Sequence, residues 1–147
     1  MLRGGGVAEL GFDIATAPDG VRRVSPRIDD QPLTALVGQY ERSAGYAPDG
    51  GYGGLALDAP GLHPGHYLGE AAHAGWTYVL ACECGEVGCW PLECRIEVTR
   101  DEVVWSAFRQ PHRDAWDYAG FGPFVFDRRR YEAAVAALGA APPGPIP

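Results

Sequence analysis

All four cysteines of this chain lie in one short segment, LACECGEVGCWPLECRIEV, at residues 80–98. Their spacing is C-x-C-x4-C-x4-C, and the apolar runs on either side, AGWTYVLAC and PLECRIEV, are typical of buried β-strands. Two such strands joined by a turn form a hairpin. The sequence therefore predicts that the cysteines gather at one turn of an antiparallel sheet.

A hairpin centred near Gly88 would place Cys82 opposite Cys94, with Cys84 and Cys89 in the connecting loop. A structural zinc site needs four nitrogen or sulfur ligands, with each thiolate about 2.3 Å from the metal. The hairpin could bring four sulfur atoms to such a point. We therefore treat these four cysteines as candidate ligands of a zinc ion.

Two other interpretations of the cysteines stay open. Free cysteine is among the most buried residue types, so the thiols could pack as small hydrophobic groups without a metal. They could also be redox-active or nucleophilic. Against that third interpretation, C-x-C lacks the helix start that lowers a thiol pKa in C-x-x-C sites. The nearby carboxylates of Glu83 and Glu86 would raise the thiol pKa further.

The rest of the chain favours an α+β fold, in which two amphipathic helices pack on an antiparallel sheet. EVVWSAF follows the cysteine segment and predicts the third strand of a meander that begins near Trp76. Asp30 and Asp127 are candidate N-caps of the two helices, and Gly45 and Gly139 are candidate stops. The apolar faces predicted for the helices consist of Leu33, Leu36, Val37 and Tyr40, and of Tyr131, Ala134, Val135 and Leu138.

Three further segments complete the predicted organisation. VAELGFDIA and VRRVSPRID read as extended segments around a Pro-Asp-Gly turn, and Pro26 suits an edge strand or an irregular one. Residues 45–69 are rich in Gly, Pro and Tyr and predict a long ordered loop. We expect residues 1–140 to form a single globular domain and residues 141–147 a flexible Pro-rich tail.

The charge of the chain limits its expected partners. The net charge is −7, and every basic residue is arginine, so lysine-based covalent chemistry is excluded. An acidic chain is repelled by nucleic-acid phosphates and by anionic membranes, so we expect neither as a partner. The N-terminal sequence has no apolar stretch of signal-peptide length, which predicts a cytoplasmic protein with reduced thiols.

Several motifs together resemble an uncharacterised group of small bacterial proteins. The motifs are CECGEVGCWPL, VVWSAFRQPHR, WDYAGFGPFVFD, YEAAVAAL and RIDDQPL, which span most of residues 27–138. The shared pattern is C-x-C-G-x-x-G-C-W, followed by a Gln-Pro-His-Arg loop. The resemblance implies no activity. Cys94 lies outside the motif. The resemblance therefore favours a metal site made of Cys82, Cys84 and Cys89 with one other ligand.

His112, in the Gln-Pro-His-Arg loop, is the natural candidate for that other ligand, because it follows the third strand of the meander. An isolated loop histidine is more often exposed or hydrogen-bonded than a ligand. His63 and His66 form H-P-G-H and could share a metal, although two solvent-facing imidazoles is the simpler interpretation. His73 has no evident partner in the sequence.

Aromatic residues crowd the second half of the chain. Trp90, Trp116 and Tyr118 are candidates for a hydrophobic recognition patch beside the cysteine turn, or they could simply cover the sheet.

Two classes of function remain. The first is a small acidic accessory protein that acts through contact with another protein, with zinc as a possible structural cofactor. The second is a small metal- or thiol-dependent enzyme with a pocket between loops 45–69 and 109–123, which also leaves room for a small-molecule ligand. An enzyme would need groups such as His112, Asp117 and a cysteine to converge.

Overall fold

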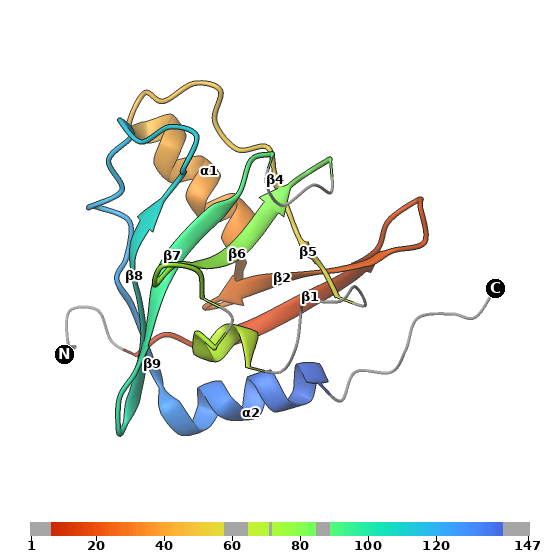
Figure 1. The fold of residues 1–147 in the computed structure, drawn as a ribbon, viewed down its shortest axis with the longest axis vertical. Helices are drawn as coiled ribbons and strands as arrows, with labels where there is room; N and C mark the ends of the chain where they lie inside the picture. The colour runs from red at the N-terminus through yellow and green to blue at the C-terminus, as the bar shows by residue number, and fades with distance from the viewer. Residues whose placement is uncertain (1–6, 58–64, 71, 85–88, 140–147) are drawn as a thin grey trace.

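The structure is a computed structural model that describes residues 7–57, 65–70, 72–84 and 89–139 (Figure 1). Two helices and a short 3-10 helix, η1, are distributed among the strands. In chain order the elements are β1 (Leu10–Thr16), β2 (Arg22–Ile28), β3 (Gln31–Pro32), α1 (Leu33–Ser43), β4 (Tyr52–Gly53), β5 (Leu55–Ala56), η1 (His66–Leu68), β6 (Thr77–Cys82), β7 (Leu92–Val98), β8 (Glu102–Arg109), β9 (Phe124–Asp127) and α2 (Arg128–Gly139).

The strands of the described residues form two antiparallel sheets. One has the order β1-β2-β3, with β5 also paired to β2, and the other has the order β4-β6-β7-β8-β9. The predicted meander corresponds to β6, β7 and β8, and β9 extends it by one strand. The predicted α+β fold is therefore confirmed.

The N-terminal hairpin forms around the Pro-Asp-Gly turn as predicted, where Gly20 has a φ of 83°. For Pro26 the sequence predicts an edge strand or an irregular one, and the second alternative applies: β2 is not an edge strand, but its pairing on one side is interrupted. β2 pairs with β1 along its whole length, and its other side pairs with β5 at Arg23 and Val24 and with β3 at Arg27 and Ile28. Pro26 lies between these two short pairings, so a proline is accommodated inside a central strand.

Helix α1 packs on β2 and β3. It buries Leu33 and Val37, as the periodicity predicts. Asp30 is not its N-cap: this residue has a φ of 66° in the turn before β3, and Pro32 precedes the helix without a side-chain cap. The helix ends just before Gly45, whose φ of 81° allows the chain to leave the helical path.

Helix α2 packs on β1, β8 and β9, below the sheets in the view of Figure 1. The predicted N-cap is confirmed, because Asp127 Oδ2 accepts a hydrogen bond of 3.0 Å from the Arg130 amide. Tyr131 and Val135 are buried, whereas Leu138 is only partly buried against the core. The predicted tail at residues 141–147 lies outside the described residues.

The core joins both sheets and both helices in one hydrophobic cluster. At its centre the Trp105 indole donates a hydrogen bond of 2.9 Å to the Tyr131 hydroxyl, which in turn donates to the backbone carbonyl of Tyr67. Tyr67 belongs to η1, so the end of the long loop is anchored in the core. This packing fixes β6 and β7, which carry the cysteine segment.

Candidate metal centre

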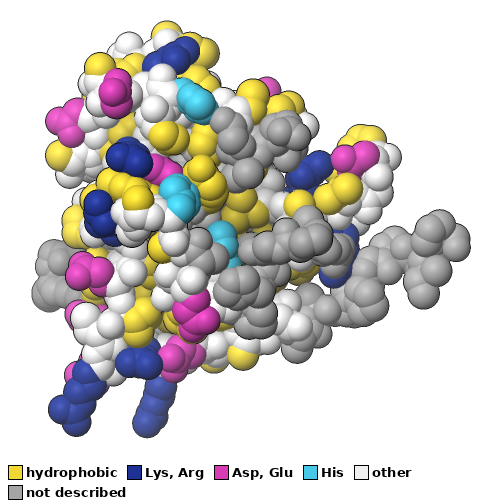
Figure 2. Space-filling model, viewed as in Figure 1, with side chains coloured by type: hydrophobic (Ala, Val, Ile, Leu, Met, Phe, Trp, Pro, Cys, Tyr) yellow, Lys and Arg dark blue, Asp and Glu magenta, His cyan; other side chains and the backbone are white. Residues whose placement is uncertain are grey.

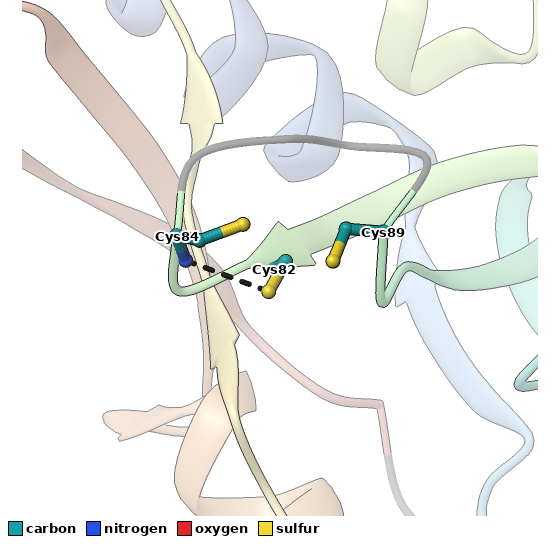
Figure 3. A group of neighbouring side chains, drawn as sticks. All are labelled: Cys82, Cys84 and Cys89. Carbon is teal, nitrogen blue, oxygen red and sulfur yellow. Dashed lines mark hydrogen bonds between the residues drawn. The ribbon is translucent and has the colours of Figure 1, made fainter.

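Cys82, Cys84 and Cys89 converge at the turn between β6 and β7. Their sulfur atoms all lie within 4.8 Å of one another. Figure 3 shows the thiols directed toward a shared space: Cys82 comes from the end of β6, Cys84 from the turn that follows, and Cys89 from the approach to β7. We call these three residues the cysteine cluster. Their arrangement could hold a metal ion.

The cluster is accessible to solvent, and its thiols interact with one another. Cys84 and Cys89 are exposed, and Cys82 is half-buried. The Cys84 amide donates to Cys82 Sγ at 3.5 Å. Hydrogen bonding to Cys82 and Cys84, together with the negative charge of those groups once ionised, raises the pKa of Cys89 to about 11. Three neighbouring thiolates repel one another, and a bound divalent cation would reverse this effect because it stabilises each thiolate.

The long loop holds the end of β6 in place. In the short β4–β6 ladder Tyr52 pairs with Cys82 and Gly53 with Ala81, and the Glu83 amide donates a hydrogen bond of 2.9 Å to the Gly51 carbonyl. A Cβ added at Gly53 would lie 3.0 Å from Glu83 Cα, so the close approach of β4 to the end of β6 leaves little room for a side chain at this position. The Gly-rich sequence of this loop therefore supports the cluster.

Cys94 does not lie opposite Cys82, so the predicted register is wrong. Cys94 pairs with Thr77, while Cys82 is at the other end of β6 and pairs with Tyr52. The ladder shifts between Tyr78 and Leu80, and the strands pair at Leu80 and Leu92 before the connection begins. Cys94 is fully buried, and burial, followed by the charge of Glu93, raises its pKa. This cysteine belongs to the core.

His112 does not belong to the cysteine cluster. Among the described residues, the group of possible ligand atoms within 4.8 Å of one another that includes the cluster consists of Cys82, Cys84 and Cys89 alone. The His112 side chain is exposed at the end of β8, and its backbone amide donates to Gln110 Oε1 at 2.9 Å. Of the other histidines, His66 is buried, with Nε2 2.8 Å from the Tyr78 carbonyl oxygen, which corrects the expectation of a solvent-facing imidazole. His63 lies outside the described residues.

An aromatic surface adjoins the cysteine cluster. Trp90 follows Cys89 and meets Trp116 edge to face, with ring centroids 6.1 Å apart. Trp116 stacks on Tyr46 at 4.8 Å, and the Arg113 guanidinium lies 4.9 Å from the Trp90 ring centre. These four residues, Tyr46, Trp90, Arg113 and Trp116, are referred to below as the aromatic surface. Their contacts place the 109–123 loop against Trp90, beside the cysteine cluster.

Tyr118 does not share the exposure of the two tryptophans. It is 4% exposed, and its hydroxyl donates a hydrogen bond of 2.5 Å to Glu41 Oε2. Glu41 is itself fully buried and also accepts from the Tyr52 hydroxyl at 2.6 Å and from the Gly50 amide at 2.8 Å. Its carboxylate therefore ties α1 to both loops beside the aromatic surface.

A second buried carboxylate lies on the outer face of β7. Glu93 is 1% exposed and interacts with Arg109 and with His73, whose Nε2 lies 3.0 Å from its Oε1. The guanidinium groups of Arg109 and Arg95 stack on Trp76, at 3.8 and 4.2 Å from its ring centre. His73 thus has a partner that the sequence did not reveal.

Sequence reasoning missed both carboxylates. Glu41 carried a signal, because it follows Leu33 and Val37 by eight and four residues and so lies on the apolar face of α1. Glu93 carried none, since strand alternation places it on the solvent side of β7 with Arg95. The residues that cover it come from a separate turn and from β8.

The 109–123 loop lines a pocket, but with β8 and Trp76 rather than with the 45–69 loop. Asp117 is among the lining residues, whereas His112 and the cysteines are not. Asp117 Oδ1 accepts a hydrogen bond of 2.8 Å from the Ala119 amide, so this carboxylate shapes the loop. The enzyme constellation considered from the sequence does not line this pocket.

Comparison with known proteins finds no match to this chain among family models, curated proteins or solved structures. The resemblance to small bacterial proteins therefore stays a prediction. In the part of the chain that the structure describes, no helix has the length and apolarity that crossing a membrane requires.

Proposed function

We propose that this chain is a small, acidic, cytoplasmic accessory protein that acts through contact with another protein. In this proposal the cysteine cluster holds a zinc ion, and the ion fixes the turn that contributes Trp90 to the aromatic surface. The observation that supports the metal is the convergence of three thiols within 4.8 Å from the two ends of one connection. Thiolate donors suit zinc among the common cellular cations.

Three thiolates would supply three of the four ligands that zinc prefers. Cys94 is held in the core, and His112 is not within the same set of ligand atoms in the described residues. Because structural zinc sites are closed by four protein ligands, we infer that a protein group other than these two residues takes the fourth position. The role of the ion would be to hold the β6 end and the β7 approach together.

The protein-binding part of the proposal rests on the aromatic surface. Tryptophan, tyrosine and arginine are the side chains that most often dominate the energy of protein interfaces. Trp90 and Trp116 are only partly buried, and Arg113 is exposed above them. The net charge of −7 favours a partner with a basic surface.

Elemental analysis of protein purified without chelator tests the metal. We expect about one zinc per chain, and we expect the variant Cys84→Ser to lose most of it. Cys94→Ala is the matched control, because it removes a thiol of the same segment that lies outside the cluster, and it should keep the metal. Metal-free protein, or equal loss of zinc in both variants, would contradict the proposed site.

A pull-down with purified protein tests the contact. The variants Trp116→Ala and Arg113→Ala should lose a partner that the parent protein retains, and the distant exposed variant Arg129→Ala should keep it. If zinc removal releases the same partner, the metal supports the surface as proposed.

A further inference from the structure

The pocket beside the aromatic surface has a chemistry that the proposed zinc site does not explain. It has a volume of about 540 Å³, within the range of ligand sites. Aromatic side chains form part of its walls, among them Trp76, Phe108, Trp116 and Phe121. Two charged side chains line it, Asp114 and Asp117, and both are exposed. An open pocket with aromatic walls and two lining carboxylates suits a ligand with an aliphatic body and a positive end.

A bulge in β8 shapes one wall of this pocket. Ala107 and Phe108 together face the single residue Cys94, because the ladder shifts between the Glu93–Arg109 and Arg95–Ser106 pairs. Ala107 has a φ of 54°, a conformation that is costly for a residue with a Cβ. As a result Phe108 is buried, while Ala107 is exposed at the pocket wall.

The cations near this pocket already have partners. Arg109 forms an ion pair with Glu93, and the guanidinium groups of Arg95 and Arg109 both stack on Trp76. In contrast, neither Asp114 nor Asp117 forms an ion pair with another described residue. Asp114 and the second oxygen of Asp117, whose Oδ1 accepts from the Ala119 amide, could therefore meet an external cation, and the net charge of −7 would raise the local concentration of cations.

We propose that this pocket binds the side chain of a lysine or arginine from the partner protein; this inference rests on the proposed protein contact. The methylene groups of such a side chain would lie against the aromatic walls, and its charged end would reach Asp114 and Asp117. Two guanidinium groups already stack on the Trp76 ring. The carboxylates, rather than the face of this ring, would therefore recognise the positive charge.

Three peptides test the inference: acetyl-Gly-Gly-X-Gly-Gly-amide with X as lysine, arginine or norleucine. Norleucine keeps the aliphatic body of lysine and lacks its charge. In NMR titrations at low salt we expect the lysine and arginine peptides to bind with millimolar affinity, on the order of tenfold more tightly than norleucine. Shifts should concentrate on the indole signals of Trp76 and Trp116, and binding should weaken as salt is added.

The double variant Asp114→Asn/Asp117→Asn should remove the preference for charged peptides, because its amides keep the size and the hydrogen-bonding oxygen of the aspartates. The control Glu97→Gln/Asp101→Asn makes the same change in net charge at exposed positions outside the pocket and should leave binding unchanged. Equal binding of the lysine and norleucine peptides, or equal losses in the two double variants, would overturn the inference.

The same titration in the Cys84→Ser variant separates this inference from the zinc proposal. Peptide binding that persists in zinc-free protein supports the pocket and counts only against the role of zinc. A protein that carries zinc and shows no preference for charged peptides overturns the pocket while the metal proposal stands.

Discussion

Cys94 and the cysteine cluster lie in the same short segment but in opposite environments. Cys94 is fully buried on β7, where it pairs with Thr77, whereas two of the three cluster thiols are exposed at the far end of β6. Both environments raise a thiol pKa, but for different reasons: burial for Cys94, and the neighbouring thiols for Cys89. Strand register, rather than spacing in the sequence, thus decides which cysteines can share a metal.

The difference has a chemical consequence. A divalent cation can reach the cluster and would relieve the repulsion among its thiolates. Cys94 gains nothing from a cation that it cannot contact, and it contributes to the core as a small apolar side chain. The segment therefore combines a candidate ligand set with part of the core.

The largest expected difference between the two environments is in chemical labelling. In metal-free, reduced protein at pH 8, Cys82 and Cys84 should react with a small alkylating reagent, and Cys89 should react more slowly because its pKa is raised, while Cys94 stays unmodified. Because Cys94 must wait for the fold to open, its rate should be slower by at least roughly a thousandfold. Mass spectrometry of the labelled protein checks this, and rapid labelling of all four thiols would place Cys94 at the surface.

The second prediction concerns the pH at which Cys89 ionises. Its raised pKa means that Cys89 stays protonated through neutral pH and becomes a thiolate only as the pH rises through about 11. In the variant Cys82→Ser/Cys84→Ser the pKa should return toward 9, the ordinary value for this thiol. The fraction of Cys89 present as thiolate should then be about a hundredfold higher in the variant than in the parent protein at pH 7, and about fiftyfold higher at pH 9.

Alkylation of Cys89 as a function of pH, in metal-free protein, measures this change. The observation that would count against the cluster is a midpoint near pH 9 in the parent protein as well as in the double variant. Zinc should act in the opposite direction and release protons on binding, because only the thiolates are ligands.

The third prediction is the cost of a hydroxyl in place of the Cys94 sulfur. Cys94→Ser buries a polar group on a strand between core residues and should lower the free energy of unfolding by about 1–3 kcal/mol. Cys94→Ala separates this polar cost from the loss of packing, since alanine adds no polar atom. Urea unfolding of the parent protein, Cys94→Ala and Cys94→Ser measures these two costs. A serine variant as stable as the parent would show that position 94 is hydrated.

Part of this arrangement could be predicted from the sequence. The strands on either side of the cysteines have clear apolar patterns, so a hairpin that brings Cys82, Cys84 and Cys89 to one turn follows from the local sequence. The contact between Trp90 and Trp116 also follows, because a meander returns the end of its third strand to the first turn. These features depend on short connections between regular elements.

The rest depends on longer-range geometry. The β6–β7 ladder shifts at residues 78–80, and this shift separates Cys82 from Cys94. The residue types at these positions do not predict it. β4 consists of two residues in a Gly-rich loop, too few for a pattern, and yet it determines the partner of Cys82. Glu93 is covered by side chains from distant segments. Register and coverage of this kind arise from packing of the whole chain.

The smallest expected effect comes from substitutions inside the cluster when no metal is bound. Each of the variants Cys82→Ser, Cys84→Ser and Cys89→Ser should change the free energy of unfolding by less than about 0.5 kcal/mol in the presence of a chelator, because solvent reaches the cluster and serine remains hydrated. Added zinc should stabilise the parent protein in proportion to its affinity and should stabilise each variant less. Thermal unfolding with and without zinc measures both quantities.

Large losses of stability without metal would mean that the three thiols, like Cys94, contribute mainly through packing. Losses of stability that are small with chelator and larger with zinc would show that the cluster, unlike Cys94, contributes to stability through the metal.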